Sequence, residues 1–290
     1  MAQQKSEREY FTKRLVLRVA LILIIFPCIY ALLFLLPYYR FLALNFSIAA
    51  FTFMGTLEVR NLVEKQGINT YRYLAPVLGA SLPLCAYLIV ISGLQRGFIA
   101  IWLAAALAML LIRGIIVQSK QQLPQLLTRI SSSFLIVCYP GFFLSFLTFM
   151  TGWEEASYRL LFFLSLIFGN DIVAYVAGNL IGRSGNFIIS PNKSMAGFIA
   201  GFLSSIIVSW IYYLVLPQLF PTSLAVMLVF GAVMGATTIL GDLVESAFKR
   251  SAEVKDSGTI MIGRGGFLDS LDSMLISAPV FFTFFQYILR

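Results

Sequence analysis

The sequence contains no histidine, and only 12% of its 290 residues carry a charged side chain. A typical soluble domain has about 25% charged residues. Its three cysteines, Cys28, Cys85 and Cys138, lie far apart in apolar runs and form no Cys-x-x-Cys pair. These absences exclude a zinc site and a histidine-based catalytic triad. The cysteines are expected to serve only in packing.

Apolar residues make up most of the chain: 59% are hydrophobic, and the mean hydropathy is +0.88. One core of this size cannot bury so many apolar side chains, so the solvent must be lipid. We predict an all-α, polytopic, multi-pass membrane protein. About nine transmembrane helices are expected, at approximately residues 15–37, 41–57, 73–93, 97–116, 130–150, 158–180, 195–217, 222–241 and 271–289.

The first apolar run is too long for a signal-peptide core and is interpreted as a retained membrane span. Seventeen of the 21 lysines and arginines fall on the cytoplasmic side if the amino terminus is cytoplasmic, as the positive-inside rule requires. These basic residues are scattered singly despite a net charge of +8, which argues against nucleic-acid binding. Glu58, near the end of the second span, is expected to be an interface charge.

A polar segment at residues 118–124 is the expected boundary between two membrane regions. Residues 1–124 would form an amino-terminal region with spans one to four and little chemistry. Residues 125–290 would form a carboxy-terminal region with spans five to nine and the catalytic site.

The aspartates are concentrated in one stretch. The chain has five, and four of them lie between residues 241 and 273. On a helix, Asp242 shares a face with Glu245, and Asp269 shares a face with Asp272, so their carboxylates can converge. Hard oxygen ligands of this kind suit Mg²⁺ that also binds substrate phosphates. A solvated loop with paired charges is the alternative, but it does not explain why these residues stand at helix ends.

The fifth aspartate, Asp171, lies within an apolar span, where a carboxylate usually marks a functional site. Cations and glycines complete the candidate phosphate site. The loop Ser190, Lys193 and Ser194 has the groups of a phosphate-binding corner, although a Ser-Pro turn with a helix cap explains it equally well. The remaining candidates are Lys249, Arg250, Lys255, Gly263, Arg264, Gly265 and Gly266.

The segment from Ser246 to Asp272 resembles the signature of the phosphatidate cytidylyltransferase (CDP-diacylglycerol synthase) family. That signature has the form S-x-x-K-R-x4-K-D-x-G, then a Gly-His-Gly-Gly turn, then Asp-Arg-x-Asp. The matching positions are Ser246, Lys249, Arg250, Lys255, Asp256, Gly258, Gly263, Gly265, Gly266, Asp269 and Asp272. The likeness covers about residues 165–290 and includes Asp171 and the Ser190–Ser194 loop.

The resemblance implies a nine-span, dimeric enzyme of the plasma or inner membrane whose site opens to the cytoplasm. It would convert CTP and phosphatidate, or a related lipid phosphate, to CDP-diacylglycerol and pyrophosphate in phospholipid biosynthesis. Mg²⁺ would be held by Asp242, Asp269 and Asp272, with Asp171 nearby and a second cation such as K⁺ beside it.

Two positions depart from the signature: Arg264 replaces its histidine, and Ser270 replaces its arginine. A CTP-dependent polyprenol or phytol kinase, or an inactive relative, is therefore an alternative. An ion-coupled transporter that uses Asp171 is an alternative of another class, although the internal repeats typical of transporters are not evident.

Overall fold

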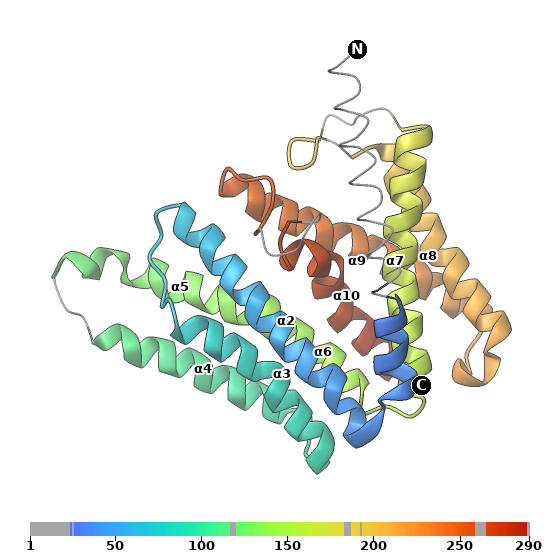
Figure 1. Ribbon diagram of the computed structural model, residues 1–290, viewed down its shortest axis with the longest axis horizontal. Helices are drawn as coiled ribbons and strands as arrows, with labels where there is room; N and C mark the ends of the chain where they lie inside the picture. The colour runs from blue at the N-terminus through green and yellow to red at the C-terminus, as the bar shows by residue number, and fades with distance from the viewer. Residues whose placement is uncertain are drawn as a thin grey trace.

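A computed structural model describes residues 24, 26–116, 120–182, 187–191, 193–258 and 265–288. Every regular element in these ranges is a helix, as predicted (Figure 1). In chain order they are η1 (Ala31–Leu35), α2 (Tyr38–Lys65), α3 (Leu74–Ser92), α4 (Phe98–Ile115), η2 (Lys120–Gln125), α5 (Leu126–Ile136), η3 (Val137–Phe142), α6 (Phe143–Met150), α7 (Ala156–Leu180), α8 (Met195–Val215), η4 (Pro217–Leu219), α9 (Leu224–Ser251) and α10 (Leu268–Tyr287).

Within the described ranges, eight helical stretches are long and apolar enough to cross a bilayer. They confirm eight of the nine expected spans. The span expected at residues 130–150 is the stretch Leu123–Met150, which includes α5, η3 and α6. Much of the first expected span, residues 15–37, lies outside the described residues, and its described part is a short apolar helix, Phe26–Leu35. The orientation of the amino terminus stays a prediction.

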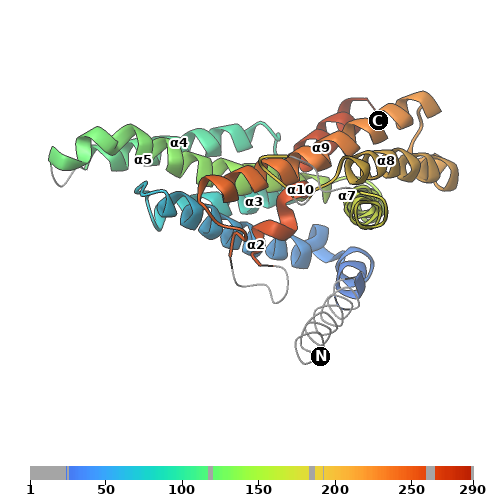
Figure 2. The same ribbon diagram turned by 90° about the horizontal axis from the view of Figure 1, so that it is seen from above.

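The helices form two groups with α10 between them (Figures 1 and 2). In the first group α2 packs against α3, and α3 also contacts α4, η3 and α6. In the second group α8 packs against both α7 and α9. Helix α10 contacts α9 on one side and α6 on the other, so it joins the two groups.

Aromatic rings hold α10 in this position. Phe281 is fully buried, and its ring centroid lies 5.1 Å from that of Phe163 on α7 and 5.4 Å from that of Phe230 on α9. From the other group, Trp153 stacks on Phe282 at 5.2 Å and on Phe285 at 4.9 Å. Lipid tails are as apolar as these side chains, so close van der Waals packing rather than water exclusion favours the association.

Helix α9 extends beyond its expected end. The sequence predicts a span over residues 222–241, whereas the helix continues to Ser251. Residues 242–251 contain no glycine or proline and include good helix formers such as leucine, glutamate, lysine and arginine, so the helix has no local reason to stop. Asp242 therefore lies more than two turns before the end of the helix, and Glu245 and Lys249 lie on its last turns.

Candidate active site

The candidate site begins with a buried ion-pair network between α9 and α10. Lys249 Nζ lies 2.6 Å from Asp269 Oδ1 and also pairs with Glu245, one turn earlier on its own helix. Glu245 is completely buried. A carboxylate at such a position is costly unless a cation is close. Lys249 therefore neutralises two acidic groups and ties the end of α9 to the start of α10.

Close backbone packing places α9 at Asp242 beside α10 at Asp272. A side chain on Gly241 would collide with the main chain of α10, because its Cβ would lie 2.6 Å from the carbonyl oxygen of Asp272 and 3.0 Å from Ser273 Cα. Only glycine permits this approach. Asp242, the next residue on α9, and Asp272 consequently lie at the contact between the two helices. Asp272 Oδ1 accepts a hydrogen bond from Ser273 N at 2.6 Å.

Asp269 acts as a cap for the loop before α10. Its Oδ2 accepts hydrogen bonds from Gly266 N at 2.7 Å, Ser257 Oγ at 2.9 Å and Ser257 N at 3.1 Å. Its other oxygen pairs with Lys249. A carboxylate at a helix amino terminus is also favoured by the helix dipole. Both oxygens of Asp269 are thus engaged by the protein, which distinguishes it from Asp242 and Asp272.

The loop before α8 contributes a lysine to the same place. Lys193 forms an ion pair with Asp242 on α9. Burial lowers the pKa of Lys193 below its ordinary value, and the nearby carboxylates of Asp272 and Asp171 oppose this shift. The ammonium group therefore contacts Asp242 and is also influenced electrostatically by Asp272 and Asp171.

The two serines of this loop have structural roles. Ser194 is the amino-terminal cap of α8, and its hydroxyl accepts a hydrogen bond from Gly197 N at 3.1 Å. The carbonyl of Ser190 accepts from Lys193 N at 3.1 Å and closes the turn. The helix-cap interpretation of this loop is therefore confirmed. The turn and the cap together fix the backbone that carries Lys193.

The remaining candidate residues lie in several different positions. Arg250 Nε donates to the carbonyl of Ile189 at 3.3 Å, which links the end of α9 to the loop before α8. Lys255 and Asp256 are exposed, and Ser246 is buried on α9. Gly265 has a φ of +97°, a left-handed conformation that favours glycine, and Gly266 donates to Asp269. Gly263 and Arg264 lie outside the described residues.

The four aspartates of the predicted metal site do not form a compact chelating group in the structure. They are Asp171, Asp242, Asp269 and Asp272. In the described part of the chain, no three histidine, cysteine or acidic side chains lie close enough to hold a metal ion together. The donor chemistry nevertheless suits a hard divalent cation. Lys193 pairs with Asp242, and the carboxylates of Asp272 and Asp171 favour its charged form against the larger effect of burial on its pKa. The set of metal ligands stays a prediction, and Asp269 is its weakest member because its oxygens are occupied.

Two residues that the sequence analysis did not select reach the site from the first group of helices. Glu58 was expected to be an interface charge, and this is wrong: it is 2% exposed and accepts hydrogen bonds from the first residues of α10. Tyr139, in η3, packs edge-on against Phe248 with ring centroids 5.1 Å apart. The one sequence feature that singled out Glu58 was its place two residues before Arg60, near the end of a span. No local feature of the sequence singled out Tyr139.

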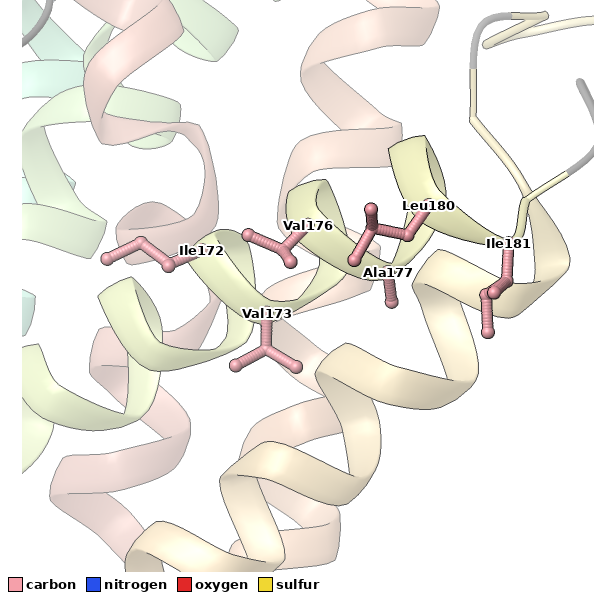
Figure 3. Close-up of a pocket in the computed structure, with 6 residues that line it drawn as sticks. All are labelled: Ile172, Val173, Val176, Ala177, Leu180 and Ile181. Atoms are coloured by element: carbon pink, nitrogen blue, oxygen red, sulfur yellow. The ribbon is translucent and has the colours of Figure 1, made fainter.

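An apolar pocket lies on the carboxy-terminal half of α7 (Figure 3). It is lined by aliphatic side chains that begin directly after Asp171: Ile172, Val173, Val176, Ala177, Leu180 and Ile181. This lining offers no hydrogen-bond partner for a nucleotide. The pocket therefore suits hydrocarbon, and the phosphate chemistry belongs to the charged cluster on α9 and α10.

Fold and site together define a polytopic helical membrane protein with a lysine–carboxylate cluster between its last two helices. A protein-family model described as "Cytidylyltransferase family" matches residues 13–288. The chain belongs to this family.

Three relatives illustrate the likeness. The phosphatidate cytidylyltransferase of Chlamydia trachomatis is 40% identical over 124 residues, which cover 41% of this chain and 40% of that protein. The phosphatidate cytidylyltransferase of Staphylococcus saprophyticus is 37% identical over 128 residues, 44% of this chain and 48% of that protein. A protein of Escherichia coli described as "Uncharacterized protein YnbB" is 40% identical over 138 residues, 47% of this chain and 45% of that protein. The matched segments thus span less than half the length of these relatives.

Proposed function

We propose that the chain is an integral membrane nucleotidyltransferase that forms CDP-diacylglycerol and pyrophosphate from CTP and phosphatidate. One observation carries this proposal: two lysines selected from the sequence pair with two of the selected aspartates, Lys249 with Asp269 inside the signature and Lys193 with Asp242 outside it. The names of the Chlamydia and Staphylococcus relatives support the choice of substrates.

The reaction needs alignment and charge neutralisation more than proton transfer. An oxygen of the phosphatidate phosphate attacks the α-phosphorus of CTP and forms a new P–O bond. The bond from that phosphorus to the bridging oxygen of the β-phosphate breaks, and pyrophosphate leaves with the electron pair. The second pKa of a phosphate monoester is about 6, so the attacking group is largely a dianion at neutral pH. A chain without histidine is therefore suited to this chemistry.

The cations of the site would bind the polyphosphate. Lys249 and Lys193 are held by carboxylates and are consequently ordered before substrate arrives. Arg250 and Lys255 are exposed and follow Lys249 closely in the chain, and they would contact the leaving pyrophosphate. Ordered donors cost less to align in the transition state than flexible ones, which is the main contribution we assign to these residues.

Mg²⁺ is the cofactor that we assign to this site, with a second cation such as K⁺ as a further expectation. Asp242 and Asp272 would hold the Mg²⁺, and Asp171 would complete the acidic surroundings. When bound, the ion would supply charge neutralisation for the triphosphate and for the departing pyrophosphate. Asp269 would instead keep its role as the cap of the loop before α10.

The proposed location is a multi-pass position in the plasma or inner membrane, with the site facing the cytoplasm, where CTP is available. The distribution of lysine and arginine supports this orientation. The pocket on α7 next to Asp171 is lined by aliphatic side chains, which supports a lipid substrate that enters from the bilayer (Figure 3). A homodimer is also proposed, because the resemblance to the family implies one.

The test is an assay of the purified protein in detergent with labelled CTP, Mg²⁺ and phosphatidate. We expect lipid-linked CMP and pyrophosphate in equal amounts, and their loss when Mg²⁺ is chelated. A kinase would release CDP instead, so the product separates the two enzyme classes. Asp272→Asn should lower turnover by about a hundredfold or more while the protein still folds. Glu154→Gln, in an exposed loop, is the control. No lipid-linked CMP from any of several lipid phosphates would overturn the proposal.

A further inference from the structure

Glu58 binds the start of α10 although it comes from α2, in the half of the chain without signature motifs. Its Oε1 accepts a hydrogen bond from Phe267 N at 2.9 Å, and its Oε2 accepts from Leu268 N at 2.7 Å. A third donor, Ser257 Oγ, lies 3.0 Å from Oε2. The carboxylate is 2% exposed. One buried side chain therefore holds both Ser257, in the segment after α9, and the beginning of the last helix.

These contacts differ from the usual way in which a buried acid is stabilised. In the described part of the chain, the partners of Glu58 are N–H and O–H groups rather than a lysine or arginine. The first N–H groups of a helix have no partner within the helix and carry its positive dipole end. Glu58 satisfies two of them at α10. It serves as an amino-terminal cap that is provided by another helix.

The surrounding glycines leave room for this carboxylate. A side chain added at Gly258 or at Gly266 would collide with Glu58, and at Gly266 it would also collide with Ser257 Oγ. Both glycines belong to the signature segment. Glycine is needed at both positions because the backbone there packs directly against Glu58. This requirement is separate from any contact of the same backbone with phosphate.

Ser257 connects Glu58 to Asp269. Its hydroxyl lies 3.0 Å from Glu58 Oε2 and 2.9 Å from Asp269 Oδ2. A hydroxyl has one proton and donates to one of these carboxylates at a time. Asp269 in turn pairs with Lys249. A continuous set of polar contacts thus runs from Glu58 on α2 to the lysine of the candidate active site on α9.

We infer that Glu58 is a positioning residue for nucleotide binding, acting through the loop before α10 and through Asp269. It does not contact substrate in this role. It fixes the backbone that carries Lys255 and Asp256 and the cap that orients Lys249. This inference rests on the proposed cytidylyltransferase function, and it assigns a part of that function to the amino-terminal helices.

The decisive variant is Glu58→Gln, which keeps the size of the side chain but replaces one acceptor oxygen with an N–H donor. Either Phe267 N–H or Leu268 N–H then loses its partner. Glu64→Gln is the matched control, because Glu64 lies on the same helix and accepts from Thr70 Oγ1 at 2.8 Å, away from the signature loop. Gly266→Ala is the second variant, with Gly97→Ala as its control, since nothing lies within 4 Å of a Cβ at Gly97.

The first measurement is hydrogen–deuterium exchange of the backbone amides of residues 266–268, read at residue resolution. We expect exchange at Phe267 or Leu268 to rise by about tenfold or more in Glu58→Gln, because the lost bond is to a charged acceptor. Exchange within the later turns of α10 should not change. This measurement needs no turnover, so it is decisive for Glu58 even if the proposed reaction is not observed.

The second measurement compares the KM values of the two substrates. Misplacement of the loop should raise the KM for CTP by about tenfold and leave the KM for phosphatidate within about twofold, because the proposed lipid pocket lies on α7 rather than on this loop. A general loss of folded protein would not separate the two constants. Wild-type exchange and an unchanged KM for CTP in both Glu58→Gln and Gly266→Ala would overturn the inference. An inactive wild type would instead overturn the proposed function.

Discussion

The helices α2–α6 and α7–α9 differ in the way they use polar side chains. In the second group, charged residues gather on the last turns of α9 and pair with one another across the contact with α10. In the first group, the buried acid Glu58 contributes to the site by binding two backbone N–H groups and the Ser257 hydroxyl. One group supplies the charges that would bind phosphate, and the other holds their supporting loop in place.

The ion pair at Lys249 provides the largest test of this difference. Lys249→Gln leaves the fully buried Glu245 and the capping Asp269 without a cation, so we expect a loss of about 3–5 kcal/mol in stability. Thermal unfolding in detergent measures it. The control is Arg60→Gln in the first group, where the Arg60–Glu64 pair is 3.9 Å long and partly exposed, and a loss below about 1 kcal/mol is expected.

A double variant sharpens this result. Glu245→Leu together with Lys249→Met removes the completely buried carboxylate along with its cation, so a large part of the stability should return. Asp269 still lacks its cation, but it keeps its hydrogen bonds from Gly266 N and Ser257 N. CTP-dependent turnover should stay absent, because the proposed phosphate ligand is gone. Full recovery of turnover in the double variant would contradict the role of Lys249.

The two helix caps of the second group give a test of intermediate size. Ser194→Ala and Ser223→Ala each remove the cap of a long helix, α8 and α9 respectively, and each should cost about 1 kcal/mol. Only the Ser194→Ala variant should also raise the KM for CTP, because Ser194 follows Lys193 directly. Equal effects of the two variants on this KM would show that the loop before α8 does not bind nucleotide.

Tyr139→Phe is the smallest change and concerns the first group. The buried hydroxyl of Tyr139 has no hydrogen-bond partner among the described residues, so its removal should change stability by less than about 0.5 kcal/mol. We expect turnover to stay within about twofold of wild type. A much larger loss of turnover would show that the first group contacts substrate directly, and the division of roles between the groups would then be wrong.

The apolar runs of the sequence were sufficient to predict the eight described spans and the helical class. They were sufficient because bilayer thickness and helix periodicity act locally along the chain. The expected span ends at residue 241 because apolar length fixes only the part of a helix that lies in the bilayer, whereas α9 continues for about ten polar residues that favour a helix.

Contacts between distant segments could not be predicted in the same way. The carboxylate of Glu58 meets Leu268, 210 residues later in the chain, and no local pattern encodes that meeting. The same holds for Asp269, whose spacing suggested a metal ligand while its oxygens are occupied by Ser257, Gly266 and Lys249. Spacing on one helix identifies which side chains share a face, but the partner on the opposite element decides what they bind.

The pairing of Lys193 with Asp242 and of Lys249 with Asp269 has a consequence for the kinetics of substrate capture. A site with bare cations attracts an anion over long range, and dissolved salt weakens that attraction strongly. Here the charges of Lys193 and Lys249 are already compensated by carboxylates within the site. An arriving triphosphate must exchange places with the carboxylates at short range, so its association rate should depend only weakly on ionic strength.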